Sequence, residues 1–367
     1  MRTRAAAIGL IAVALGGAVV FWKSCGDSQK KPETPAKAEG PKPVDVAAKL
    51  REQKPRAPAA TAPTAAPESE PAPAPGPEVV FSSPWGGETL DQVGRVRPSE
   101  ANPEGPMSFT VDGKGRVYVL DQVNGRVVRR GADGKPEVAF PIEAQAAQDI
   151  AVADDGSAAV LDRFNAKSVT LYDEKGAKVG ELPLKGEELE ETGLVTGVFV
   201  DGNDVYVEKE HGPLYKIGDK SGAPALGDEQ VEIPGRPSRD GLSFLKAGVI
   251  DPPVGRVFVS SVERATMQHR FTRELRLDAP VQAIVLLDSD KSGMIYFAAQ
   301  VERSPGDEVV FLTCLEPQKG VPVGTAVMPA NTLPEETFRD LAVLDGGGVI
   351  YSLRSETGVS YQKYDCE

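Results

Sequence analysis

A hairpin pattern that returns about every 47 residues is the feature that most constrains the fold of this chain. Its clearest copy, Arg116–Arg130, reads RVYVLDQVNGRVVRR: an alternating apolar run, a polar turn with Asn124 and Gly125, and a second β-rich run. Two such runs joined by a few turn-forming residues are typical of a β-hairpin. Five weaker copies follow it, so the chain is a repeat of small β units.

The spacing of the copies predicts the architecture. One aligned residue in the expected second strand marks the position of each copy, and these residues are Tyr118, Ala159, Tyr206, Phe258, Tyr296 and Tyr351. The intervals of 41, 47, 52, 38 and 55 residues lie in the range of propeller blades. We therefore predict an all-β, six-bladed β-propeller over residues 78–367, with four short strands in each blade.

The closure of this ring can also be predicted. The last blade runs out of chain one strand short, whereas Glu78–Ser82, reading EVVFS, precedes the first blade. A closed ring hides long sheet edges. We expect Glu78–Ser82 to pair outside the C-terminal strand and lock it in place.

The first copy resembles a known family. Pro106–Arg130, PMSFTVDGKGRVYVLDQVNGRVVRR, is similar to an NHL repeat, and the second copy keeps Asp162 and Asn165 of that motif. Copies three to six lose the Asp–Asn pair. The resemblance implies a six-bladed propeller that binds protein, RNA or small ligands, with some members acting as lyases or lactonases; the fold does not choose among these.

The N-terminal segment Ala5–Trp22 is 18 residues long, uncharged and almost wholly apolar. It would span roughly 27 Å as a helix, close to the thickness of a bilayer core. Arg2 and Arg4 precede it, so we expect residues 1–4 to form a cytoplasmic N-terminus. We predict an uncleaved transmembrane signal anchor, single-pass in a bacterial inner membrane. A cleaved signal peptide and a lipoprotein signal ending at Cys25 are the alternatives, and all three place the propeller in the periplasm.

Residues 23–77 are rich in Lys, Pro, Ala and Glu and offer almost nothing apolar to bury, so we expect a disordered Pro-rich linker. The chain has 54 acidic and 41 basic side chains, a net charge of −13, which argues against a nucleic-acid partner. Its two His have no Ser or Cys partner at a catalytic spacing. We expect a binding or scaffold module for a protein or a cell-envelope polymer, without a cofactor, rather than an enzyme.

Two sets of loops should lie on one face of the ring: those from second to third strands and those from an outer strand to the next inner strand. We call this the long-loop face, and the opposite one the short-turn face. The longest and most charged loops lie on the long-loop face, which makes it the candidate binding surface. The candidate binding residues are Arg163, Glu188, Glu191, Glu210, His211, Arg264, His269, Arg303 and Arg354.

Two carboxylates support an alternative function. Asp149 and Asp340 each precede an inner strand (QDIAV and RDLAV) and are predicted to face the central channel at the same height. Lactonase-like propellers bind a metal there, and Ca²⁺ would suit such oxygen ligands. The alternative is therefore a metal-dependent lactonase or hydrolase working at the channel mouth. Two carboxylates are few for a metal site, and the main prediction contains no metal.

Cys314 and Cys366 end matching strands of the last two blades. An oxidising compartment would allow them to bond if their Cα atoms lie within about 7 Å. The sequence leaves this pairing open.

Overall fold

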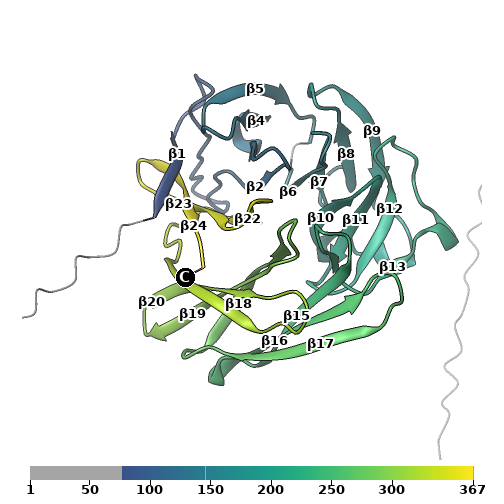
Figure 1. Cartoon of the computed structure of the whole chain (residues 1–367). Helices are drawn as coiled ribbons and strands as arrows, with labels where there is room; N and C mark the ends of the chain where they lie inside the picture. Colours follow the sequence, from purple (N-terminus) through teal and green to yellow (C-terminus); the bar gives the residue numbers. More distant parts are fainter. Residues whose placement is uncertain (1–76, 145, 367) are drawn as a thin grey trace, which may run out of the picture. The chain divides into compact units, whose positions relative to one another are not determined.

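The computed structural model describes residues 77–144 and 146–366, and the predicted anchor and nearly all of the predicted linker lie outside them. The described chain forms six four-stranded antiparallel sheets, which confirms the predicted all-β six-bladed propeller. Figure 1 shows the sheets arranged around a ring. Within the described ranges, no helix has the length and apolar character needed to span a membrane.

Each blade is one sheet, and in blades 1 to 5 the strands run in chain order from the channel outward. Blade 1 contains β2 (Ser108–Val111), β3 (Val117–Asp121), β4 (Arg126–Arg130) and β5 (Pro136–Pro141). Blade 2 contains β6 (Asp149–Val152), β7 (Ala158–Asp162), β8 (Ser168–Tyr172) and β9 (Lys178–Pro183). Blade 3 contains β10 (Val195–Asp201), β11 (Asp204–Lys209), β12 (Leu214–Asp219) and β13 (Glu232–Ile233).

Most strands of the remaining blades are longer, although β14 has two residues and β22 has three. Blade 4 contains β14 (Arg236–Pro237), β15 (Ser243–Asp251), β16 (Arg256–Glu263) and β17 (His269–Arg276). Blade 5 contains β18 (Val281–Ser289), β19 (Ile295–Ser304), β20 (Asp307–Leu315) and β21 (Pro322–Pro329). Blade 6 contains β22 (Leu341–Val343), β23 (Val349–Ser355), β24 (Gly358–Tyr364) and, outermost, β1 (Glu78–Pro84). Short 3-10 helices lie in connections: η2 (Gln122–Asn124), η3 (Glu187–Leu189), η4 (Thr192–Leu194), η5 (Gly227–Glu229) and η6 (Pro252–Val254).

The hairpin of blade 1 shows how the repeat folds. All five residues of β3 are buried, because a second strand is covered by the blades on either side of it. Asp121 ends this strand and is fully buried; its carboxylate accepts hydrogen bonds from the Gly94 N–H (2.7 Å), Asn124 Nδ2 (2.8 Å) and Arg126 Nε (2.8 Å). Gly125 closes the turn with φ of 63°, which favours glycine. The Asp and Asn of the repeat therefore stabilise the turn.

The ring closes as predicted. β1 pairs antiparallel with β24, from Glu78 opposite Lys363 to Pro84 opposite Gly358. The ring of Phe81 stacks on Tyr361 with centroids 4.3 Å apart. Figure 1 shows β1 beside β24 at the end of the chain.

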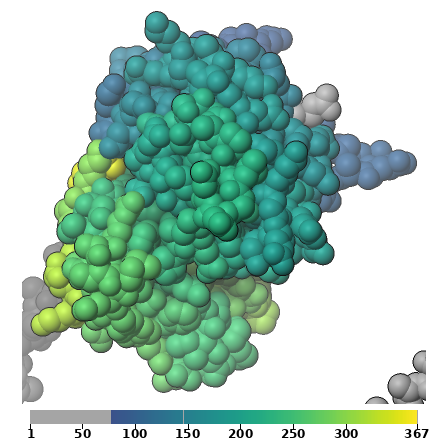
Figure 2. Space-filling model, turned by 90° about the vertical axis from the view of Figure 1, so that its right-hand side faces the viewer, coloured from purple at the N-terminus to yellow at the C-terminus, as the bar shows by residue number. Residues whose placement is uncertain are grey.

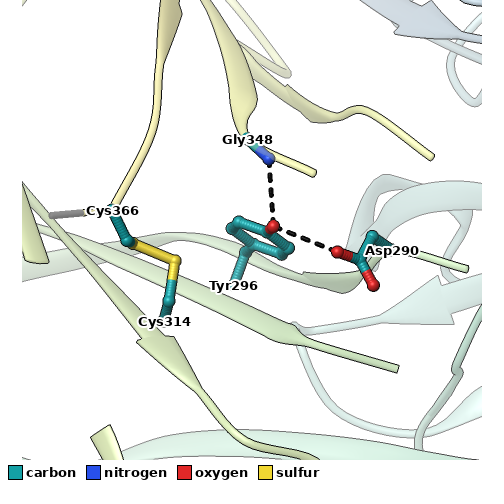
Figure 3. The surroundings of a disulfide bond; sticks show 5 residues. All are labelled: Asp290, Tyr296, Cys314, Gly348 and Cys366. Carbon is teal, nitrogen blue, oxygen red and sulfur yellow. Dashed lines mark hydrogen bonds between the residues drawn. A yellow bond between two sulfur atoms is a disulfide. The ribbon is translucent and has the colours of Figure 1, made fainter. Parts of the chain in front are cut away.

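A disulfide and a tyrosine join the last two blades. Cys314 of β20 is bonded to Cys366, with Cα atoms 6.1 Å apart. Near it, the Tyr296 hydroxyl donates to Asp290 Oδ2 (3.1 Å) and accepts from the Gly348 N–H (2.9 Å), as Figure 3 shows. The disulfide and the Gly348–Tyr296 hydrogen bond therefore tie blade 5 to blade 6.

Blade 4 differs from the prediction. The fourth copy of the repeat places its second strand around Phe258, but this residue lies in β16, the third strand. The true second strand is β15, and the true first strand is β14, which has only two residues. The η6 hairpin, with two prolines and Gly255, looks like a first turn in the sequence but joins the second and third strands. The loop after Glu263 therefore lies on the short-turn face.

The apolar core consists of clusters that each fill the space between neighbouring blades. Such clusters join blades 4 and 5, 5 and 6, 6 and 1, 1 and 2, and 2 and 3. Among the residues that the structure describes, no such cluster joins blades 3 and 4. Figure 2 views the ring from the side on which β12 and β13 of blade 3 lie in Figure 1. We call the boundary between these two blades the blade 3–4 seam.

Candidate functional site

A cavity of about 920 Å³ runs along the centre of the ring and is lined by residues of all six blades. Its lining is most polar at the blade 3–4 seam. There, polar and charged side chains take the place of the apolar clusters that join the other neighbouring blades. The lining includes Thr196, Phe199, Glu208, His211, Arg236, Lys246, Gln282 and Arg339. We take the long-loop end of this cavity as the candidate functional site.

A buried ion pair crosses the seam inside the cavity. Arg236 of β14 holds Glu208 of β11 with two hydrogen bonds, Nε to Oε1 (2.9 Å) and Nη2 to Oε2 (3.1 Å). The Glu208 side chain is only 3% exposed. Burial alone would raise the pKa of Glu208, but the charges of Arg236 and His211 outweigh it and lower that pKa to about 2. Glu208 therefore stays ionised at any physiological pH and holds Arg236 in place.

A second ion pair joins the same two blades near the short-turn face. Arg264 Nη2 lies 2.6 Å from Asp201 Oδ2, with both side chains partly exposed. The seam is thus held by charge at both ends of the ring.

A strained turn carries His211 to the cavity. Glu210 and His211 both have positive φ, 50° and 54°, a conformation that costs non-glycine residues about 1–3 kcal/mol each. Two hydrogen bonds hold the turn: the Glu210 N–H to Leu194 O and the His211 N–H to Thr196 Oγ1, each 2.9 Å. The imidazole Nδ1 lies 3.7 Å from Glu208 Oε2, while the side chain is 74% exposed. Backbone strain is concentrated at functional sites in many proteins, and here it presents an accessible imidazole beside the ion pair.

An aromatic ring lies between two guanidinium groups in the cavity. Phe199 of β10 has Arg236 4.9 Å and Arg339 5.3 Å from its ring centroid. A Cβ on Gly197 would come within 2.8 Å of this ring, so the glycine makes room for it. Arg339 reaches from the loop before β22 to Asp149 of blade 2, Nη2 to Oδ2 2.6 Å. It therefore crosses the channel mouth from blade 6 to blades 2 and 3.

The carboxylates of Asp149 and Asp340, the candidate metal ligands, already accept hydrogen bonds from protein groups. Asp149 is fully buried and accepts from Ser108 Oγ (2.6 Å), the Val198 N–H (3.0 Å) and Arg339. Each of its oxygens therefore has a partner.

Asp340 is engaged in the same way. Its Oδ2 accepts from Asn331, Thr337 and Arg354, and its Oδ1 accepts from Ser352. Both carboxylates are neutralised by arginine, so these residues do not fit a divalent cation. Elsewhere in the described ranges, no three His, Cys, Asp or Glu side chains gather closely enough to hold a metal ion.

The short-turn end of the cavity is crossed by ion pairs. Arg239 of blade 4 binds Asp288 (2.7 Å) and Asp345 (2.9 Å), and Lys291 Nζ lies 2.8 Å from Asp345. Lys291 also lies 3.5 Å from Asp154 of blade 2. Burial would raise the pKa of Asp345, but Lys291 and Arg239 lower it. This end is therefore linked across blades 2, 4, 5 and 6, whereas the long-loop end offers free donors.

The candidate binding residues have several different locations. His211 lines the cavity, and Glu210 precedes it in the same turn. Arg264 and His269 lie on the short-turn face, because Arg264 begins the connection from a third strand to a fourth and His269 begins that fourth strand. Arg163 binds the backbone oxygens of Gly193 and Val195 (3.1 and 2.6 Å) and so braces a loop.

The others form local contacts. Glu188 pairs with Lys209 (3.3 Å), Arg303 pairs with Asp307 (3.0 Å), and Arg354 is buried against Asp340 (3.3 Å). Glu191 is exposed beside η4. These residues do not form one site.

Of the residues that gather at the cavity, His211 was among the candidates, but Glu208, Arg236 and Arg339 were missed in the sequence. Glu208 and Arg339 each adjoin an apolar run, where a charge is unusual, and this was the available signal. Arg236 lies in a Gly- and Pro-containing segment, GRPSRDG, that reads as a charged loop. Its partner Glu208 is 28 residues away and in another blade.

The chain matches no protein-family model and no curated protein. Among solved structures it is similar to hydrazine synthase of Kuenenia stuttgartiensis (15% identity, TM-score 0.46, covering 71% of this chain and 78% of that chain). It is also similar to virginiamycin B lyase from Staphylococcus aureus (12%, 0.40, 74% and 98%) and to glutaminyl cyclase of Myxococcus xanthus (12%, 0.38, 79% and 97%). At these identities and TM-scores the likeness carries no argument about function, and the propeller fold rests on the strand pairings of this chain.

Proposed function

We propose that this protein is a membrane-anchored, periplasmic binding propeller that holds an anionic group of a partner, a protein or a cell-envelope polymer, at the long-loop end of its channel. One observation supports it above the others. The acidic side chains Glu208 and Asp149 are buried and neutralised, whereas the cationic groups around them remain within reach of a ligand.

Three basic side chains make up this accessible set. Lys246 is exposed, lines the cavity and forms no ion pair within the described part of the chain. His211 is 74% exposed. Arg339 uses only Nη2 in its hydrogen bonds, and its side chain is 23% exposed. A carboxylate or another anion would meet donors without having to displace a paired acid.

Binding is preferred to catalysis for a related reason. The alternative, a metal-dependent lactonase or hydrolase, would need free carboxylate oxygens at the channel mouth, and Asp149 and Asp340 each have both oxygens occupied. The resemblance of Pro106–Arg130 to NHL repeats agrees with a binding role, and we propose a distant relationship to that family. The membrane anchor over residues 5–22 remains a prediction from the sequence.

The test measures binding of two defined polyanions, poly-L-glutamate and polygalacturonate, to the full-length chain by fluorescence anisotropy. At least one should bind saturably, and K246E should weaken it tenfold or more because it reverses the charge of an unpaired cation. K135E is the matched control, since Lys135 is an exposed lysine in a turn outside the cavity lining. The proposal is wrong if neither polyanion binds saturably, or if K135E weakens binding as much as K246E does.

A further inference from the structure

The channel edge of blade 4 is open over more than half of its length. β14 pairs only with Phe244 and Leu245 of β15. The next residues, 246–250, form a ladder with β16 on their outer side. On their inner side, the described residues supply no hydrogen-bond partner for this stretch of backbone. We call residues 246–250 the open β15 edge.

Blade 5 shows what this edge lacks. The two blades have long strands of similar length, and in blade 5 the first strand, β18, pairs with β19 from Val281 to Ser289. In blade 4 the corresponding first strand stops after two residues. A strand added beside residues 246–250 would therefore occupy the position in blade 4 that β18 occupies in blade 5. Five residues at about 3.4 Å each give a site about 17 Å long.

The side chains on either side of this position are exposed to the cavity. Gln282 and Ala283, at the start of β18, are exposed and line the same cavity as Lys246 to Val249. By contrast, the first strands of blades 1 and 6 are buried throughout. Val249 and Ile250 are 42% and 43% exposed, which is unusual for apolar residues of a central strand. An unpaired strand edge with exposed apolar neighbours is a template for an incoming strand.

The side chains around the edge define what that strand should carry. Leu245 and Ala247 pack into the core between blades 4 and 5, so Lys246, between them, faces blade 3. Arg236 and His211 line the cavity on that side. An added strand would thus direct alternate side chains toward basic groups and toward the apolar residues of blade 5. The complementary sequence alternates acidic with apolar residues.

We propose that the open β15 edge binds an extended segment of a partner protein, with alternating acidic and apolar residues, as an additional strand of blade 4. The inference rests on the proposed function and narrows its ligand from any polyanion to a peptide. Main-chain hydrogen bonds supply affinity and the alternating side chains supply specificity, as in other cases of strand addition.

The experiment uses fluorescent seven-residue peptides and the full-length chain. A peptide in which glutamate and valine alternate should bind at least tenfold more tightly than one with the same composition in two blocks. Two further versions carry backbone N-methyl groups on all glutamates or on all valines. The N–H groups of alternate residues point to the same edge of a strand, so one version should lose binding at least tenfold and the other should keep it. K246E should weaken binding of the alternating peptide, and K135E should leave that binding unchanged.

Each of the following outcomes would contradict the inference that a partner segment binds as an added strand. If both N-methylated versions bind as well as the parent while K246E still weakens them, the site binds anions without strand pairing; the proposed function then stands and this inference fails. The same holds if polygalacturonate binds and no peptide does. If the chain alone forms a dimer that K246E disrupts, a second copy rather than a partner protein occupies the edge, and this inference fails. If nothing binds saturably, both proposals fail.

Discussion

Glu208→Gln is the sharpest test of the charged seam. Glutamine keeps the shape of the side chain but leaves Arg236 without its counter-ion in a largely buried place. The pKa of Glu208 is about 2 in the folded chain, against an ordinary value of 4.5. That gap corresponds to about 3 kcal/mol of unfolding free energy at neutral pH. Removing one partner of a buried ion pair costs a similar ~3–5 kcal/mol in other proteins.

The sign of the pH dependence follows from the same values. Because the folded pKa lies below the ordinary one, ionised Glu208 favours the folded state. Its contribution is complete above pH 4.5 and is lost as the pH falls toward about 2. The variant should therefore be less stable than the parent by about 3 kcal/mol at pH 7, and the difference should shrink steadily below pH 4.5.

The assay is urea unfolding of the full-length chain followed by circular dichroism, at several pH values between 7 and 2.5. Glu188→Gln is the matched control: Glu188 also pairs with a basic residue, Lys209, but is 55% exposed. It should change the unfolding free energy by no more than about 0.5 kcal/mol. If the two variants are equally stable at pH 7, or if the loss in Glu208→Gln does not depend on pH, the seam is not held as described.

Three further predictions concern the closure of the ring. Phe81→Ala removes the stacking of β1 on Tyr361 and should lower the unfolding free energy by about 3–5 kcal/mol, whereas Val79→Ala, at an exposed position of the same strand, should have little effect in the same melt. Tyr296→Phe leaves the Gly348 N–H without its acceptor and should cost about 1–3 kcal/mol, measured by thermal unfolding. Reduction of the disulfide, which closes a loop of 52 residues, should lower the unfolding free energy by at most about 4 kcal/mol, with the reduced and oxidised chains compared in one urea titration.

Most of the ring could be predicted because its signals are local. Val117–Asp121 and Arg126–Arg130 are β-rich runs on either side of a turn that Asn124 and Gly125 specify, so the strand bounds agree with the structure. The closing role of Glu78–Ser82 followed from counting strands, and the structure extends it only to Pro84.

Blade 4 could not be predicted, because its first strand has too few residues to show a period. Arg236–Pro237 contains a proline and a charge, both typical of loops. The Pro-Pro-Val-Gly turn of η6 then took the place of the first turn in the alignment, and the error moved Arg264 and His269 to the wrong face. The candidate site failed for a different reason: Glu208, Arg236 and Arg339 come together only when three blades close around the channel, and nothing in the spacing of one sequence reports that.

The missing apolar cluster between blades 3 and 4 also determines how this ring can come apart. In the described part of the chain, five apolar clusters join the blades in sequence from blade 4 through blades 5, 6, 1 and 2 to blade 3. Strand β1 is the outermost strand of blade 6, near the middle of this series. At the boundary between blades 3 and 4, two ion pairs, Glu208–Arg236 and Arg264–Asp201, join the blades instead. Salt should weaken the partly exposed Arg264–Asp201 pair, and acid below about pH 4.5 should weaken the buried Glu208–Arg236 pair. The ring should therefore open at the blade 3–4 seam while β1 stays paired with β24, and amide exchange in β13 and β14 should speed up before that in β1.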